Sequence, residues 1–309
     1  MEVKPGLKII IGLAAALLLL CPMESAAGVV NVNSTAAFLK IPAGARPAAL
    51  GGMFVSISDD ANGVNCNPAG LTLLNKKEIS AMYNVWFADI TSQLISYVQP
   101  LNPRASMGLS LLRYGYGTFE RRTGPSTAST GEFTAQDMAV TLSGSYKVSG
   151  SLRTGINVKY VYMDIDSITA SALALDAGIL YNVDKITLGL TLSNFGPKAK
   201  FSVKEENLPA LVDAGVTIKL LGDKLAVTGG IKNYLYDSNT IIGAGAEMNL
   251  NKMLFLRAGY AYSLEGTVTG LKGLSGGAGI RVSAFQVDYA FVPFDELGNT
   301  HRIAVSSRF

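Results

Sequence analysis

Residues 44–71 read GARPAALGGMFVSISDDANGVNCNPAGL, and this stretch differs from everything that follows it. It is rich in alanine and glycine, whose small side chains let one backbone approach another closely. We therefore expect it to pack inside the rest of the chain. Ser58 or Asp59 is the expected N-cap of a short helix over residues 60–64. Asn67 before Pro68 is a second helix start, and Gly70 is expected to end that turn.

Residues 1–27 have the features of a secretory signal peptide. Lys4 and Lys8 precede an apolar core over residues 9–20, and Ser25 opens a small-residue cleavage site. The uncharged run is about 15 residues long, short of the roughly 20 that a membrane helix needs. Cys21 raises the alternative of a lipoprotein, but Leu20 precedes it where a small residue is wanted.

The composition points to a surface in contact with lipid. Hydrophobic residues make up 49% of the chain and charged residues 16%, yet no apolar run after residue 28 approaches the 18 residues of a membrane helix. The excess apolar surface suits the outside of a barrel. The formal charge of +3 is mild, and no basic patch with interleaved aromatics indicates nucleic acid as a partner.

Alternation of period two runs through the chain after residue 75. Leu188, Leu190 and Leu192 alternate with Gly189 and Thr191, for example. Such a strand has one apolar and one polar face. A soluble β-sandwich would show the same alternation with its apolar face inward, so periodicity alone leaves both architectures open.

Connection lengths favour the barrel. We expect fourteen strands, near residues 78–86, 92–100, 105–114, 133–147, 152–164, 172–182, 186–193, 210–220, 225–235, 240–250, 255–264, 274–282, 285–292 and 301–309. Tight turns alternate with longer loops such as 115–132 and 194–209, as in outer-membrane barrels. The predicted fold is an all-β transmembrane antiparallel barrel of about 14 strands. Its expected parts are a signal peptide (1–27), a plug-like N-terminal segment (28–75) with helical and irregular structure, and the barrel (76–309).

Side-chain patterns add two expectations. Aromatic residues near the long-loop ends of the strands predict an interfacial girdle; they are Trp86, Phe87, Tyr114, Tyr116, Phe195, Tyr234, Tyr236, Tyr262, Phe291 and Phe294. The polar strand faces carry eight cations (Arg153, Lys159, Lys219, Lys232, Arg257, Arg281, Arg302 and Arg308) and five anions (Asp137, Asp176, Asp213, Glu247 and Asp288). We expect these lumen charges to pair rather than form a selectivity filter.

Both ends of the chain resemble the PorV/PorQ family of outer-membrane proteins and, more distantly, the FadL-type transporters. The motifs are Pro47-Ala-Ala-Leu-Gly-Gly, Asp59-Asp60-Ala61-Asn62, Asn67-Pro68-Ala69-Gly70-Leu71, Asp288-Tyr-Ala-Phe-Val-Pro-Phe, Leu297-Gly-Asn-Thr-His-Arg-Ile and the terminal Phe309. The plug signature is thus Pro47, Gly51, Gly52, Asp59, Asp60, Asn67, Pro68 and Gly70. Phe309 ends a strand that resembles the C-terminal assembly signal of such barrels.

Catalysis is not expected, because His301 is the single histidine and no G-x-S-x-G elbow, metal motif or P-loop is present. No cofactor or metal is predicted. The resemblance implies a bacterial outer-membrane location, contact with outer-membrane lipid, and a role as partner of secretion-machinery or cargo proteins. The alternative is passive transport of a hydrophobic small molecule, as in FadL-type proteins. An apolar pocket inside the barrel would favour transport, whereas polar lumen walls and an apolar loop patch would favour the secretion role.

Overall fold

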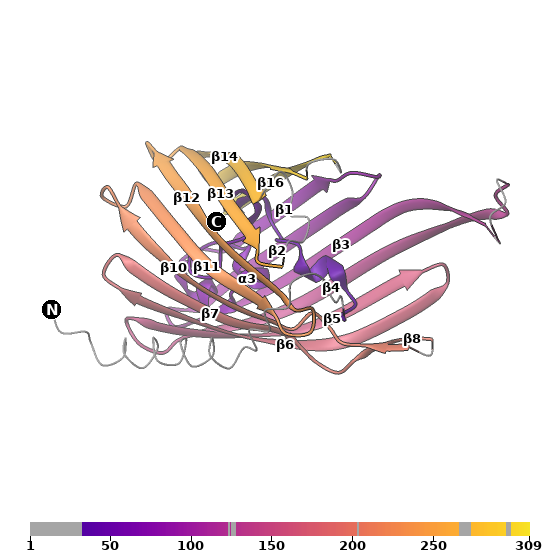
Figure 1. The fold of residues 1–309 in the computed structure, drawn as a ribbon. Coiled ribbons are helices and arrows are strands. Elements are labelled where there is room, and N and C mark those ends of the chain that lie inside the picture. The colour runs from indigo at the N-terminus through magenta and orange to yellow at the C-terminus, as the bar shows by residue number, and fades with distance from the viewer. Residues whose placement is uncertain (1–32, 123, 125–127, 203, 266–272, 295–297) are drawn as a thin grey trace.

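The computed structural model describes residues 33–122, 124, 128–202, 204–265, 273–294 and 298–309. The expected signal peptide therefore lies outside the described residues, as does Leu297 of the C-terminal motif. Fourteen antiparallel strands form a closed barrel in which β1 pairs with both β2 and β16 (Figure 1). The predicted fold class and strand number are confirmed.

The barrel strands are β1 (Glu78–Val85), β2 (Thr91–Asn102), β3 (Ala105–Arg121), β4 (Gly131–Lys147), β5 (Leu152–Ile165), β6 (Ile168–Val183), β7 (Ile186–Phe195), β10 (Leu211–Leu220), β11 (Leu225–Tyr234), β12 (Asn239–Leu250), β13 (Leu254–Ser263), β14 (Leu274–Val282), β15 (Phe285–Pro293) and β16 (Asn299–Arg308). β3 and β4 project beyond the other strands (Figure 1). We call the projecting ends of β3 and β4 the long hairpin. The long hairpin and the additional strands β8 (Ala199–Phe201) and β9 (Lys204–Glu206) occupy regions predicted to be loops.

The direction of the side chains separates a barrel from a sandwich. On β5, the apolar Ile156, Val158 and Tyr160 are exposed on the outside of the barrel, while Asn157 and Lys159 are buried on the inside. The same order repeats around the wall, with leucine, isoleucine, valine and tyrosine outward. An apolar exterior around a polar interior is the arrangement of a barrel whose solvent is lipid. No helix among the described residues is both long and apolar enough to cross a bilayer.

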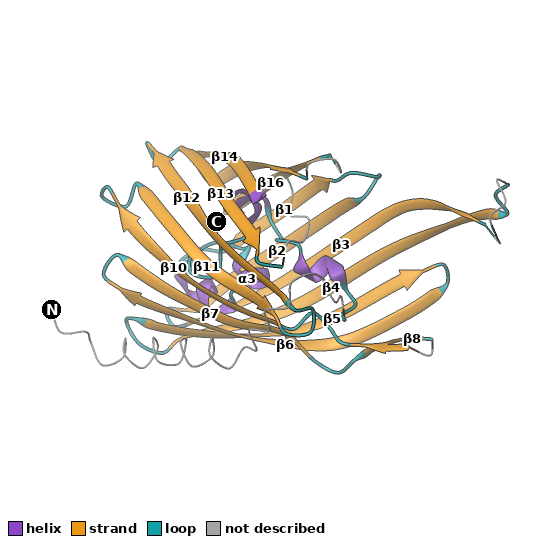
Figure 2. Cartoon of the chain, in the orientation of Figure 1, coloured by secondary structure: helices purple, strands orange, loops and turns teal. Residues whose placement is uncertain are grey.

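Four short helices precede the barrel and lie within it (Figure 2). They are η1 (Ala37–Lys40), α2 (Ala45–Ala49), α3 (Gly63–Cys66) and η2 (Pro68–Leu73). The Asn67 side chain accepts a hydrogen bond from the Ala69 N–H, as expected for a cap before Pro68. The predicted helix over residues 60–64 is wrong: α3 begins at Gly63, and the Ser58 hydroxyl donates to the Phe54 carbonyl instead of capping it. Nor does Gly70 end η2, which continues to Leu73.

Inward-facing glycines mark where residues 44–71 contact the wall. A Cβ added at any of eight of them would lie less than 3.0 Å from an atom of that segment; they are Gly108, Gly155, Gly178, Gly189, Gly215, Gly245, Gly259 and Gly277. Real Cβ atoms essentially never approach so closely. These glycines come from eight strands, so the segment is seated against most of the circumference of the barrel. We call this set the glycine belt.

Candidate functional site

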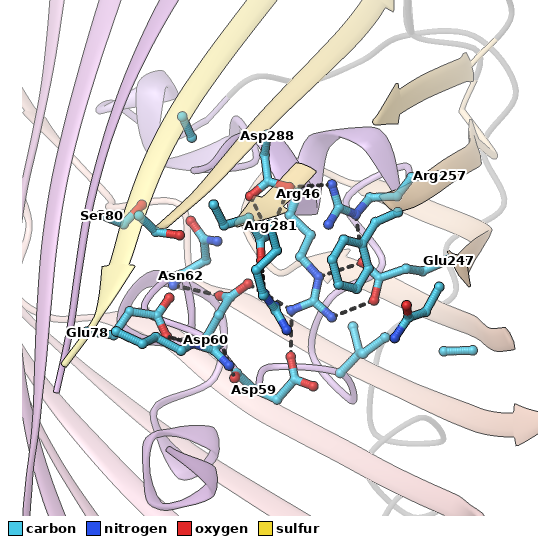
Figure 3. A pocket seen from close by; sticks show the side chains of 18 of the residues that line it. Arg46, Asp59, Asp60, Asn62, Glu78, Ser80, Glu247, Arg257, Arg281 and Asp288 are labelled. Carbon is cyan, nitrogen blue, oxygen red and sulfur yellow. Dashed lines mark hydrogen bonds and ion pairs between the residues drawn. The ribbon is translucent and has the colours of Figure 1, made fainter. Parts of the chain in front are cut away.

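Arg46 on α2 is the centre of a buried ion-pair network that joins the N-terminal segment to the wall (Figure 3). Its Nε and Nη2 donate to the Glu247 carboxylate of β12 at 2.7 and 2.8 Å. Its Nη1 donates to Asp60 at 2.8 Å and to Asp59 at 2.5 Å. Burial alone would lower the pKa of Arg46, but Asp59, Glu247 and Asp60 together raise it well above its ordinary value. Arg46 is therefore a permanent cation here.

The network continues around the barrel wall. Arg257 on β13 donates to Glu247 at 2.6 Å and to Asp288 of β15 at 2.7 Å. On the other side of the segment, Glu78 of β1 accepts hydrogen bonds from the Ala61 N–H and from Arg308 of β16. Two carboxylates of the wall, Glu247 and Glu78, thus hold the segment from opposite directions. We call Arg46, Asp59, Asp60, Glu247, Arg257 and Asp288 the Arg46 network.

A polar cavity of about 200 Å³ adjoins this network at the end of the barrel that carries the tight turns. Besides the network, Lys219, Lys224 and Arg281 line it. The Arg281 guanidinium lies over the Phe255 ring, 4.8 Å from its centroid, and its Nε donates to Gln286. The lining of this cavity is thus mainly charged and polar.

A second cavity of about 210 Å³ lies at the long-loop side of the segment, and its lining is largely apolar. Ile41, Pro42, Ala48, Met53, Trp86, Ile241, Ala261, Val292 and Phe294 contribute to it. The rings of Trp86 and Phe294 meet edge to face, with centroids 5.5 Å apart. We call this space the inner cavity; it can hold a small hydrophobic molecule because such sites are concave and mostly apolar with a few polar groups.

Three cations also line the inner cavity: Lys40, Lys232 and Arg302. Lys40 pairs with Asp237 at 2.6 Å, and Lys232 lies 3.5 Å from Asp213. Arg302 is only 2% exposed, and its Nη1 donates to the Pro42 carbonyl at 2.6 Å. Its Nε has no hydrogen-bond partner in the described chain. A buried donor without a partner carries a free-energy cost.

An open groove of about 620 Å³ lies outside the inner cavity, between the long hairpin and the β8–β9 hairpin. Its walls include Tyr116, Phe119, Phe133, Ala135, Met163, Ile165 and Phe201, and residues 34–37 form its floor. The Phe119 and Phe133 rings stack with centroids 5.3 Å apart. Residues 39–42, which follow directly, line the inner space of the barrel. One stretch of chain therefore runs from this outer groove to the inner cavity.

The eight residues of the expected plug signature lie in one region. Pro47 is in α2; Gly51 and Gly52 follow it with φ of +67° and +76°. Asp59 and Asp60 bind Arg46, while Asn67, Pro68 and Gly70 lie at the start of η2. A Cβ at Gly70 would lie 1.8 Å from the Ser58 carbonyl oxygen, so only glycine fits there. At the C-terminus, Phe309 exchanges backbone hydrogen bonds with Lys77, and its ring is exposed.

Other expected side-chain roles are confirmed only in part. Lys159 pairs with Asp176 and Lys232 with Asp213, as predicted for lumen charges, but Arg302 bonds to backbone. The girdle prediction is wrong for Tyr114 and Tyr234, which are buried in the lumen, and for Trp86 and Phe294, which line the inner cavity. Tyr114 packs against Phe38 of η1, and the Tyr234 hydroxyl donates to the Lys40 carbonyl. The N-terminal segment fills the lumen and supplies these rings with an inner partner, which an aromatic count does not reveal.

His301 and Cys66 show no catalytic arrangement. His301 lies outside the barrel, its Nδ1 2.8 Å from the Tyr289 hydroxyl. Burial raises the pKa of the Cys66 thiol to about 12, so it stays protonated at neutral pH. Among the described residues, no three His, Cys, Asp or Glu side chains are arranged to hold a metal ion.

The structure is a closed 14-stranded barrel with an N-terminal segment in its lumen and an apolar cavity on the long-loop side of that segment. The chain belongs to the uncharacterised protein family UPF0164, whose model matches residues 23–178. A UPF0164 protein of Treponema pallidum (strain Nichols) is 26% identical over 179 residues, which is 54% of this chain and 45% of that protein. The matched part is thus less than half of this relative.

Solved structures agree on the fold. The CymD monoaromatic hydrocarbon channel gives a TM-score of 0.65 at 14% identity, covering 86% of this chain and 97% of that one. The Pseudomonas putida toluene transporter TodX gives 0.62 at 13% identity over 82% and 97%. A Pseudomonas aeruginosa FadL homologue gives 0.58 at 14% identity over 91% and 99%. Identities this low show the fold alone. The family found is UPF0164, and membership of PorV/PorQ stays a hypothesis.

Proposed function

We propose that this protein lies in the bacterial outer membrane and admits hydrophobic small molecules passively, without enzymatic activity. The observation that carries the proposal is the inner cavity: it is apolar, lies inside the barrel and is flanked by Trp86 and Phe294. An apolar pocket inside the barrel is what distinguishes the transport hypothesis from the secretion hypothesis. Neighbours in fold that are described as transporters of toluene and channels for monoaromatic hydrocarbons support the same choice.

The route begins at the outer groove. Its aromatic walls collect the compound, and residues 34–42 lead from the groove floor to the inner cavity. Transfer from water into either site is favoured by about 25 cal/mol for each Å² of apolar surface removed from water. Entry therefore lowers the exposed apolar area of the compound, and net transport follows its concentration gradient across the membrane.

In this proposal, residues 33–75 act as a plug beneath the inner cavity; residues 28–32 of the expected plug-like segment lie outside the described residues. The glycine belt brings residues 44–71 into close contact with eight of the fourteen strands, which narrows the path for water and ions. The Arg46 network ties the plug to β12 and limits its movement. Passage to the periplasm then requires the plug to shift, and the strength of the network sets how often this happens.

A role as partner of secretion-machinery or cargo proteins receives no support from these structural neighbours. The apolar loop residues that this role would use are Phe119, Phe195, Phe201 and Leu208. Phe119 and Phe201 line the outer groove and Leu208 is buried, which leaves Phe195 as the one of the four that is exposed away from the groove. Transport is therefore the preferred hypothesis, and the secretion role would return if a processed cargo protein co-purified with the barrel.

Trp86 provides a direct test because it is the single tryptophan of the chain and lines the inner cavity. We expect 1-bromodecane to quench its fluorescence saturably in the purified protein. Ala261→Phe, which projects a ring into the cavity, should raise the apparent Kd about tenfold, equivalent to ~1.4 kcal/mol. The control is Ala258→Phe on the outward face of the same strand, which should quench like wild type. Equal quenching in wild type and both variants would mean that the quencher acts from the detergent, and it would contradict binding in the inner cavity.

A further inference from the structure

We propose that Arg113 on the outside of β3 is the centre of a binding site for the phosphate of an anionic lipid headgroup. This inference rests on the membrane location of the barrel and not on the compound that it transports. Arg113 follows Leu109 and Leu111 on the outward face of β3, and all three side chains are exposed. A cation among lipid-facing leucines needs a partner, because charges on this face destabilise a barrel in a depth-dependent way.

The depth of Arg113 matches a headgroup. Arg113 is eight residues beyond Ala105, the first residue of β3 after the tight turn. For a strand tilted by about 40°, eight residues rise about 20 Å along the membrane normal. The apolar band of such barrels is about 25 Å tall. The Arg113 guanidinium therefore lies near the outer edge of the band, where lipid phosphates begin.

Two glutamines hold the guanidinium in a fixed orientation. Arg113 Nε and Nη2 donate to Gln136 Oε1 of β4 at 3.3 and 3.1 Å, and Nη1 donates to Gln93 Oε1 of β2 at 3.3 Å. The Gln93 amide nitrogen in turn donates to the Thr91 hydroxyl at 3.3 Å. Arg113 is thus supported from the strands on both sides of β3, and its orientation is set before any ligand arrives.

The guanidinium hydrogens that the two glutamines do not use are suited to binding a phosphate group. Gln136 accepts from Nε and Nη2, and Gln93 accepts from Nη1. One hydrogen on Nη1 and one on Nη2, which form the end-on edge of the guanidinium, therefore remain available. That edge binds two oxygens of a phosphate at once. Both glutamines are neutral, so the protein does not cancel the positive charge. Below the guanidinium, Ile95, Leu109 and Leu111 offer an apolar path for the acyl chains of the same lipid.

Native mass spectrometry of the purified full chain tests the site with dioleoylphosphatidylglycerol as the probe. We expect Arg113→Gln to lower the affinity of the tightest bound lipid about tenfold, and Arg113→Lys to fall between it and wild type because lysine keeps the charge without the fork. The matched control is Arg104→Gln in the exposed β2–β3 turn, which should bind like wild type. Dioleoylglycerol, which has the same chains and no phosphate, should not occupy the site.

Several results would overturn the inference. They are unchanged lipid binding by Arg113→Gln, an equal loss in Arg104→Gln, or equal retention of dioleoylglycerol. Displacement of the lipid by saturating inorganic phosphate would identify a free-phosphate site instead of a lipid site. A heat-dependent shift in gel mobility confirms that each variant is folded, and an outward position leaves the lumen contacts untouched.

Discussion

Arg46→Met is expected to detach the plug from the barrel wall. The substitution leaves Asp59 and Asp60 without their buried cation and leaves Glu247 with Arg257 alone. Removing one partner from a buried ion-pair network costs about 3–5 kcal/mol because uncompensated charge stays buried. We expect this loss to appear as frequent opening of the lumen, measured as a rise in single-channel conductance in a planar bilayer.

Maleimide labelling of Cys66 gives a second readout of the same variant. With residues 1–27 removed, Cys66 is the one cysteine left. Burial raises its pKa to about 12 in the closed state, so labelling near pH 8 should be slow. Release of the plug exposes the thiol, lowers its pKa toward the ordinary value and speeds labelling. Arg121→Met removes an exposed pair with Asp166 and should change neither readout. If Arg46→Met keeps wild-type conductance and labelling, the network does not hold the plug.

Gly259→Ala is expected to be the most damaging small substitution in the wall. The added Cβ would lie 2.1 Å from the Gly51 nitrogen and 2.3 Å from the Leu50 carbonyl carbon. Both are backbone atoms, so neither side-chain rotation nor a small shift relieves the clash. Overpacking of this kind costs about 3 kcal/mol, and we expect a matching fall in the folded fraction measured by heat-dependent gel mobility across a urea series.

Gly276→Ala on the neighbouring strand is the control for the glycine belt. Its Cβ would point away from the plug, and the nearest atom would lie 3.7 Å away. Because glycine in a strand interior is itself unfavourable, this variant should be as stable as wild type or slightly more so. Equal stability of the two variants would mean that the plug does not press on the wall at Gly259.

Much of the architecture was predictable because a barrel strand carries its signal locally. Period-two alternation and the alternation of short and long connections depend on neighbouring residues, so the fourteen strands were located within a few residues. Strand ends were less accurate at β3, which continues to Arg121 instead of ending near residue 114, and at β6, which begins at Ile168 instead of near residue 172. β3 extends into a predicted loop, since Phe119 pairs with Phe133 of β4 across the hairpin, a contact that polar loop composition conceals.

The candidate site was less accessible from sequence because its contacts join distant residues. Arg46 is the single cation in an otherwise small and apolar stretch that also contains Asp59 and Asp60, and this was an available signal for an internal ion pair. Its wall partner Glu247 is 201 residues away. Tyr114 and Tyr234 were assigned to the wrong face for the same reason, since their partners Phe38 and Lys40 belong to the plug.

Uptake of naphthalene by cells tests the central claim most directly. The host strain should lack channels for hydrophobic compounds, and initial rates should be compared at equal amounts of folded barrel. We expect wild type and Ala258→Phe to raise the rate above that of the empty vector, and Ala261→Phe to return it close to that baseline because its ring occupies the inner cavity. A wild-type rate equal to the empty vector, or full uptake by Ala261→Phe, would contradict transport through this cavity.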